Sequence, residues 1–191
     1  PLIMATYGDD FDRYKKWLES VGISKKYMKQ ISGMFTAQAF ITTDQDDNQI
    51  TAFHPGAMTE AHQNLVLNVT DKIDLAIIAP DGRDAMIQHA QECFSKQIPF
   101  IFDPGQGLPM FDKNELLTFV EQASYIAVND YEAKLLQDKI SMTANEIASK
   151  VIALIITKGA HGSEIYADNK IYQIAPIKTS KLLDPTGCGD A

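Results

Sequence analysis

The chain has 191 residues, of which 45% are hydrophobic and 22% charged, and its formal net charge is −8. That length is enough for one domain with a buried core, while the acidic balance and the lack of a Lys/Arg run argue against a nucleic-acid partner. No apolar run is long enough to span a membrane, and no signal peptide is evident. The two cysteines, Cys93 and Cys188, lack metal-type spacing, so we expect a reduced protein of the cytoplasm.

The first third of the chain predicts a strand, a helix and a hairpin. The expected elements are a strand over 2–6, a helix over 11–21, and a hairpin formed by 34–43 and 48–53. Asp9 and Asp10 precede the helix as candidate caps, and Gly22 is placed to end it. The polar run 44–47 is the expected turn of the hairpin.

The rest of the chain alternates apolar strands with helices. Buried strands are expected over 75–79, 99–102, 125–128 and 153–157, helices over 86–94 and 116–123, and a second hairpin from 163–166 and 171–174. Thr143-x-x-Glu146 is a capping-box signature that opens a further helix. Repeated strand–helix units predict an α/β fold with a doubly wound, mainly parallel sheet that has helices on both faces.

Polar residues lie at the carboxyl ends of four of the predicted strands. They are Asp81, Asp103, Asn129 and Thr157. Ligands bind beyond the carboxyl ends of the strands in such sheets, so this edge is the expected site, although Asp103 is more typical of a residue that shapes its turn. Asn129 and Glu132 share a helix face. Their oxygens suit the Mg²⁺ of a nucleotide, and the same two residues equally fit a capping box.

The last residues carry the most specific pattern. In the run Asp184-Pro-Thr-Gly-Cys-Gly-Asp190, the glycines allow backbone N–H groups to turn together toward an anion. Asp190 comes directly after this nest and is placed to take a proton from an attacking hydroxyl. Phosphoryl transfer requires that combination of a positioned base and electrostatic stabilisation. The alternative interpretation is a glycine-rich turn between a strand and a helix.

The pattern Asp-x-Thr-Gly-x-Gly-Asp resembles the C-terminal signature of the ribokinase-like, or PfkB, kinases of sugars and nucleosides. The resemblance implies that Asp190 is the catalytic base and that the amides of Gly187, Cys188 and Gly189 form an anion hole. Cys188 stands where alanine is usual. Asp184 and Thr186 resemble positions that help to hold a monovalent cation such as K⁺.

Other segments extend the resemblance over nearly the whole chain. In the family, Asn129-x-x-Glu132 would position Mg²⁺ and ATP, and Thr157-x-Gly159 would lie along the nucleotide. The alternative for Thr157-x-Gly159 is a plain turn from strand to loop, and Lys158 is expected to be solvated rather than catalytic. The hairpin near 33–57 resembles a β-lid that folds over substrate. The substrate contacts implied by the resemblance are Ala39 and Ile41 on one lid face, and Asp81. Alternatively, one lid face packs on the domain while the other meets the lid of a second copy in a homodimer.

The expected activity is ATP-dependent phosphorylation of a primary hydroxyl. The lid run Thr43-Asp44-x-x-x-Asn48-Gln49-Ile50, followed by Pro55-Gly56-Ala57-Met58, looks most like bacterial adenosine-kinase-like members. This resemblance favours a nucleoside over a sugar as the small-molecule substrate. The alternative from another class is a non-catalytic nucleotide- or sugar-binding module. A Rossmann dehydrogenase is not expected, because this chain has no Gly-x-Gly-x-x-Gly after its first strand. Because the chain starts at Pro1 and stops one residue after Asp190, we expect residues 1–191 to be one incomplete kinase domain of a longer protein.

Overall fold

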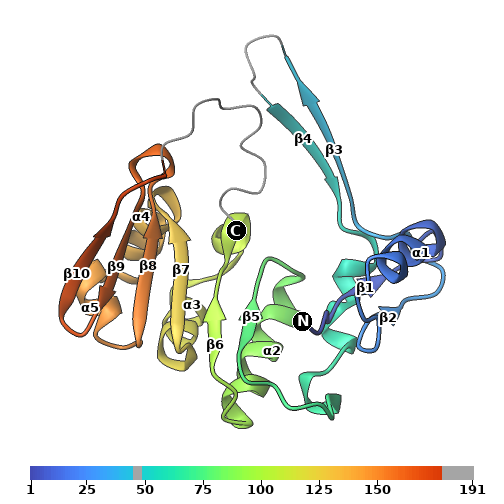
Figure 1. Ribbon diagram of the computed structural model, residues 1–191, viewed down its shortest axis with the longest axis horizontal. Coiled ribbons are helices and arrows are strands. Elements are labelled where there is room, and N and C mark those ends of the chain that lie inside the picture. The colour runs from blue at the N-terminus through green and yellow to red at the C-terminus, as the bar shows by residue number, and fades with distance from the viewer. Residues whose placement is uncertain (45–48, 178–191) are drawn as a thin grey trace. The chain divides into compact units, whose positions relative to one another are not determined.

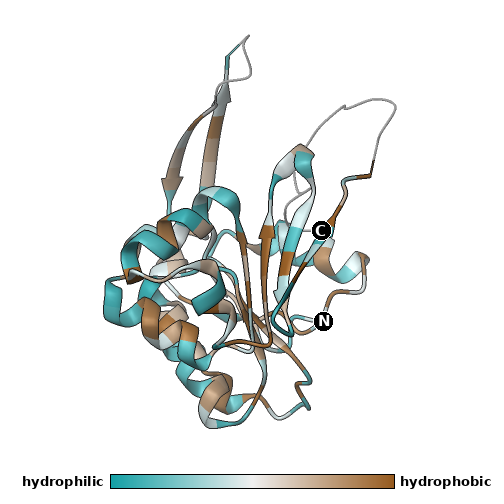
Figure 2. Cartoon of the chain, turned by 90° about the vertical axis from the view of Figure 1, so that its left-hand side faces the viewer, coloured by the Kyte–Doolittle hydropathy of each residue, from teal (hydrophilic) through white to brown (hydrophobic). Residues whose placement is uncertain are grey.

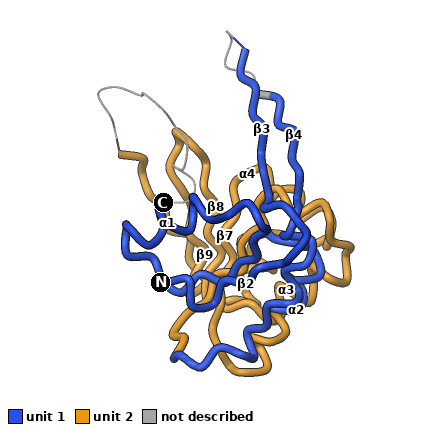
Figure 3. The backbone as a smooth tube through the Cα atoms, turned by 90° about the vertical axis from the view of Figure 1, so that its right-hand side faces the viewer, with its two compact units in different colours: residues 1–71, 81–89 blue, residues 72–80, 90–191 orange. Residues whose placement is uncertain are grey.

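The computed structural model describes residues 1–44 and 49–177. The chain divides into two compact units (Figure 3). Unit 1 comprises residues 1–71 and 81–89, and unit 2 comprises residues 72–80 and 90–191. Helix α2 (Arg83–Ser95) begins in unit 1 and ends in unit 2.

Unit 1 opens with a small parallel sheet and one helix (Figure 1). Strand β1 (Thr6–Tyr7) pairs with β2 (Lys29–Gln30), and α1 (Asp12–Ser20) lies between them in the chain. After α1, Gly22 adopts a φ of +74°, which suits the glycine expected to end this helix. The strand expected over 2–6 is wrong in its extent and its place. In the segment 2–7, only Thr6 and Tyr7 pair with another strand, and they pair with β2 in this small sheet rather than with the strands of the large sheet.

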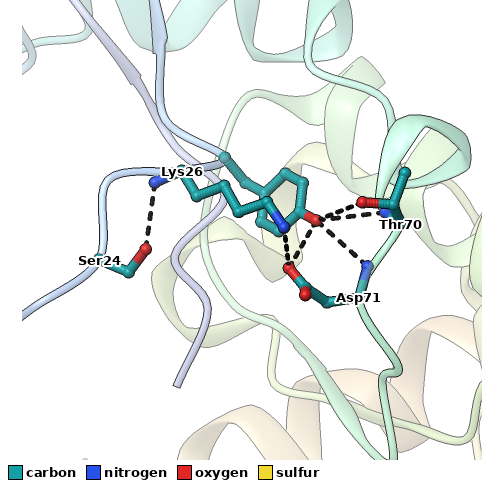
Figure 4. A network of polar contacts seen from close by, with 5 residues as sticks. Ser24, Lys26, Thr70 and Asp71 are labelled. Carbon is teal, nitrogen blue, oxygen red and sulfur yellow. Dashed lines mark hydrogen bonds and ion pairs between the residues drawn. The ribbon is translucent and has the colours of Figure 1, made fainter.

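A polar network joins the segment before β2 to Thr70 and Asp71, where the first part of unit 1 ends (Figure 4). The Tyr27 hydroxyl donates to a carboxylate oxygen of Asp71 at 2.6 Å and accepts from the backbone N–H groups of Thr70 and Asp71, each at 3.2 Å. Lys26 Nζ lies 2.6 Å from the same carboxylate oxygen. One phenol thus fixes the backbone at the point where the chain leaves unit 1.

The hairpin expected in the first third is confirmed. Strands β3 (Gln38–Thr43) and β4 (Gln49–His54) pair in antiparallel fashion, with Gln38 opposite His54 and Thr43 opposite Gln49. The hairpin stands away from the remainder of unit 1 (Figure 1). Two 3-10 helices follow it, η1 (Gly56–Gln63) and η2 (Val66–Asn68).

Unit 2 contains a six-stranded sheet with the order β10-β9-β8-β7-β6-β5. Its strands are β5 (Ala76–Ile78), β6 (Phe100–Phe102), β7 (Tyr125–Asn129), β8 (Ala153–Thr157), β9 (Ser163–Ala167) and β10 (Lys170–Ile174). Strands β5 to β8 run parallel, and β9 and β10 add an antiparallel hairpin at the edge. The predicted mainly parallel α/β sheet is therefore confirmed.

The helices of unit 2 begin at well-formed caps. After the 3-10 helix η3 (Gly105–Met110) come α3 (Lys113–Gln122), α4 (Asp130–Ile140) and α5 (Ala144–Ala148), and the 3-10 helix η4 (Gly159–His161) follows β8. All three α-helices start with a capping box, in which the N-cap side chain and a glutamate three residues later satisfy each other's backbone N–H groups. The box predicted at Thr143 and Glu146 is confirmed.

The core of unit 2 lies where the sheet meets these helices. The Phe102 ring is fully buried and stacks on Phe119 of α3 with 4.2 Å between centroids. In β7, Ile126 and Val128 are buried, whereas Ala127 between them is partly exposed. Figure 2 shows the hydrophobic residues concentrated along these strands. In the described part of the chain, no helix combines the length and apolarity that crossing a membrane requires.

Candidate functional site

The carboxyl ends of β7 and β8 bring predicted site residues together. Asn129 ends β7 and pairs in register with Thr157, which ends β8. Glu132 lies in the first turn of α4, one helical turn after Asn129, and Gly159 comes two residues after Thr157. Four residues that the sequence predicts to face a nucleotide therefore lie along one edge of the unit 2 sheet.

Asn129 and Glu132 form a capping box, as one of the two sequence interpretations predicts. The Glu132 N–H donates to Asn129 Oδ1 at 2.8 Å, and the Asn129 N–H donates to Glu132 Oε2 at 2.9 Å. The arrangement directs both side chains toward the helix N-terminus. It engages only one carboxylate oxygen of Glu132, and within the described residues Oε1 has no hydrogen-bond partner.

The small number of acidic side chains at this edge limits which kind of metal site it could form. Among residues 1–44 and 49–177, no three acidic, histidine or cysteine side chains gather into a metal cage. Magnesium does not require such a cage, because it keeps several waters and is commonly held by one or two carboxylates together with substrate phosphates. The donor set at the edge therefore fits a nucleotide-bound Mg²⁺ and does not fit a dedicated structural metal.

The turn after β8 contains backbone hydrogen bonds of its own. The Lys158 N–H donates to the Gly162 carbonyl at 2.8 Å, and the His161 N–H donates to the Lys158 carbonyl at 3.0 Å. Gly159 and Gly162 both have positive φ, at +53° and +86°. Among the described residues, a Cβ at Gly159 would meet nothing within 4 Å, whereas one at Gly162 would lie 2.0 Å from the carbonyl oxygen of Ile174. Gly159 thus leaves room for close approach, and Gly162 is required for packing.

Asp10 anchors the base of the hairpin in unit 1. Its Oδ1 accepts from the N–H and the hydroxyl of Thr36 at 2.8 and 2.7 Å, and its Oδ2 accepts from the Gln38 amide at 3.0 Å. These hydrogen bonds, that of the Thr36 hydroxyl foremost, lower the pKa of the Asp10 carboxyl. Asp9 similarly accepts from the Gly33 N–H at 2.8 Å. The expectation that Asp9 or Asp10 caps α1 is therefore wrong: α1 has no side-chain cap, and both carboxylates serve the segment that leads into β3.

Both faces of the β3–β4 hairpin carry exposed apolar side chains. Ala39 and Ile41 lie on one face together with Phe53, which pairs with Ala39. Phe40 and Ile50 lie on the other face. Ile41 is 57% exposed and Phe40 is 61% exposed, so neither face is covered within the described residues. An apolar hairpin of this kind normally meets a ligand or another protein surface.

The geometry of the site does not identify the protein family, but a comparison with a family model does. The model described as "pfkB family carbohydrate kinase" matches residues 3–191.

The chain belongs to the pfkB family.

Relatives within this family include nucleoside kinases. The structure of Burkholderia thailandensis nucleoside kinase in complex with inosine is 49% identical, with a TM-score of 0.94 over 99% of this chain and 62% of that one. The same enzyme in complex with ADP-inosine gives a TM-score of 0.92. The nucleoside kinase of Methanocaldococcus jannaschii is 33% identical over 95% of this chain and 58% of its own length. This pfkB chain thus spans about three fifths of the relatives that it matches.

Asp81 is described with unit 1, just before α2. Its Oδ1 accepts from the Gly82 N–H at 2.7 Å, and burial raises the pKa of its carboxyl. The contact with substrate hydroxyls that the pfkB resemblance implies for Asp81 stays a prediction.

The terminal pfkB signature lies outside the described residues. This applies to Asp184, Thr186, Gly187, Cys188, Gly189 and Asp190. Their expected roles as cation ligands, anion hole and catalytic base therefore stay predictions from the sequence.

Sequence reasoning missed two parts of this arrangement. The anchoring role of Asp10 had no signal in the sequence, because an aspartate before a helix is a typical cap and the contact with Thr36 depends on tertiary packing. The partner of Lys158 could not have been foreseen. Lys158 was expected to be solvated rather than catalytic; its side chain is 33% exposed, and its ammonium also forms an ion pair with Glu164 of β9. No local spacing marks a pair that depends on the antiparallel return of β9 beside β8.

Proposed function

We propose that this chain is part of an ATP-dependent nucleoside kinase, in which residues 1–191 belong to one ribokinase-like domain. The observation that carries the proposal is the likeness over 99% of the chain to a nucleoside kinase whose structure holds inosine. The edge formed by Asn129, Glu132 and Thr157 supports it, because such an edge is where parallel sheets bind nucleotides. The cytoplasmic location expected from the cysteine usage is part of the same proposal.

In the proposed reaction, Asp190 takes the proton from a primary hydroxyl of the nucleoside. The resulting oxygen attacks the γ-phosphorus of ATP, the bond to the β–γ bridging oxygen breaks, and ADP leaves with that electron pair. The amides of Gly187, Cys188 and Gly189 would donate to the oxygens of the transferring phosphoryl group, where negative charge must be stabilised. Because Asp190 directly follows Gly189 in the sequence, one short segment would supply both the base and the anion hole.

Asn129 and Glu132 are proposed to orient the nucleotide-bound Mg²⁺, which neutralises phosphate charge when bound. The free Oε1 of Glu132 supports direct or water-mediated contact. Thr157 and Gly159 would lie along the nucleotide, with Gly159 presenting open backbone. Asp184 and Thr186 would supply ligands to a monovalent cation such as K⁺ behind the anion hole.

Turnover by the intact protein tests the function. ADP release is measured with inosine, adenosine, ribose and fructose, in potassium chloride and in choline chloride. We expect the best nucleoside to exceed both sugars in kcat/KM by about tenfold or more, since a site that hydrogen-bonds a base discriminates against ligands that lack one. Slower turnover in choline chloride would support the cation site. A clear preference for a sugar would contradict the nucleoside assignment, and no turnover with any acceptor would favour a non-catalytic binding module.

The β3–β4 hairpin is proposed to serve as a lid, with Ala39 and Ile41 facing substrate and the Phe40 face packed on the lid of a second copy. The support is that both faces carry exposed apolar side chains. We expect the intact protein to sediment as a dimer, and the double variant Phe40→Thr/Ile50→Thr to weaken dimerisation by about tenfold or more. Ile41→Thr, a matched change on the opposite face, should raise the KM for nucleoside and leave the dimer intact. A monomeric wild-type protein would contradict the lid dimer.

A further inference from the structure

Glu164 collects three side-chain donors from three consecutive segments. Its Oε1 accepts from the Gln173 amide of β10 at 2.8 Å, and its Oε2 accepts from the Tyr166 hydroxyl of β9 at 3.1 Å. The ammonium of Lys158, in the turn after β8, forms an ion pair with Oε1. The Glu164 side chain is only 16% exposed, whereas that of Lys158 is 33% exposed. One sheltered carboxylate thus joins the turn after β8 to the β9–β10 hairpin.

The network keeps Glu164 charged at every pH at which an enzyme would work. The hydrogen bond from Lys158 is the largest cause that lowers the pKa of Glu164, to about 2, and the Gln173 amide contributes next. A carboxylate that accepts three donors is held in one rotamer, and a partner ammonium is held with it. Glu164 therefore holds the ammonium of Lys158, although the Lys158 side chain is 33% exposed.

The other end of the same turn packs against β10. Gly162 approaches the Ile174 carbonyl so closely that a Cβ there would lie 2.0 Å from it. Between these two ends, Gly159 faces open space as far as the described residues extend. Within the described residues, the turn from Thr157 to Gly162 is thus packed at both ends and has an open backbone at Gly159. That geometry presents backbone to a ligand without a loss of loop entropy on binding.

We propose that Glu164 is a positioning residue for nucleotide binding: by holding Lys158, it pre-forms the Thr157–Gly162 turn against which the nucleotide lies. This inference rests on the proposed function in one respect, the assignment of that turn to the nucleotide. Glu164 itself does not touch the nucleotide, and it acts only through Lys158 and the turn.

The test is the affinity of the intact protein for ADP, measured by calorimetry, because binding does not require turnover. Glu164→Gln keeps one acceptor oxygen, which can still accept from the Gln173 amide, while its new NH2 group can donate to the Tyr166 hydroxyl oxygen. The substitution removes the charge that holds Lys158. We expect ADP to bind about three- to tenfold more weakly, with an unchanged affinity for inosine. Lys158→Met should weaken ADP binding by a similar factor, and the double variant should be no weaker than either single variant, because both remove one interaction.

The matched control is an ion pair of the same unit that lies on the surface. Lys134 and Asp138 are 3.8 Å apart on α4, with side chains 79% and 67% exposed. Asp138→Asn should leave ADP affinity unchanged. The melting temperature of each variant shows whether the substitution acts locally or unfolds the protein. An ADP affinity and an inosine affinity that fall by the same factor would overturn the positioning role.

Two other outcomes would also overturn it. Unchanged ADP binding in Glu164→Gln would mean that the turn does not need its anchor. Tighter ADP binding would mean that Glu164 withholds Lys158 from the phosphates. A wild-type protein that binds ADP but turns over no acceptor would sink the kinase proposal and leave this inference to be decided by the same binding data.

Discussion

Asp190→Asn in the intact protein is expected to lower kcat by about a hundredfold or more, with little change in the affinity for ADP. A carboxamide of the same shape can accept a hydrogen bond from the substrate hydroxyl but cannot take its proton at neutral pH, and general-base catalysis contributes a factor of this size. The measurement is the initial rate of ADP release at saturating ATP and nucleoside. ADP affinity by calorimetry shows whether the nucleotide site is intact.

The control for Asp190→Asn is the same substitution at an exposed aspartate. Asp74 is paired with Lys72 at 2.5 Å, and its side chain is 78% exposed. Asp74→Asn should leave kcat and KM unchanged, because an exposed ion pair contributes little. If Asp190→Asn retained wild-type turnover, Asp190 would not be the base, and the terminal glycine run would return to its alternative interpretation as a turn.

Glu132→Gln is expected to lower kcat/KM for ATP by about ten- to a hundredfold, the usual cost of disturbing a residue that orients a metal. Glutamine can still accept from the Asn129 N–H, so the capping box of α4 survives the substitution. The lost property is the negative charge on the second oxygen. ATP dependence is measured at two Mg²⁺ concentrations, and excess Mg²⁺ should restore part of the activity.

The chain offers a matched control for this variant in α5. Thr143 and Glu146 form an equivalent box, with the Glu146 carboxylate 2.7 Å from the Thr143 nitrogen. Glu146→Gln changes the same chemical group in the same structural role, and no nucleotide contact is proposed there. Equal kinetic effects in the two variants would mean that Glu132 only caps its helix. Equal melting temperatures combined with unequal kinetics would support the metal role.

Strand and helix positions were predictable wherever the apolar pattern was long and closed by turn residues. The strand expected over 153–157 coincides with β8, and both hairpins occur where apolar runs flank polar turns. The box at Thr143 was predictable because the spacing of a cap is set by a single helical turn. The first strand was not predictable, because an apolar run becomes a strand only where another backbone is available to pair with it.

The candidate site was predictable residue by residue but not as a set of contacts. The sequence by itself determined that Asn129, Thr157 and Gly159 end their strands or follow them, since periodicity and turn chemistry are local. Only the tertiary structure decided that Asn129 lies beside Thr157, that Asp10 holds Thr36 and that Glu164 holds Lys158. These contacts join strands and loops whose neighbours are chosen by sheet order and packing, and side-chain pairing across such distances leaves no periodic trace in the chain.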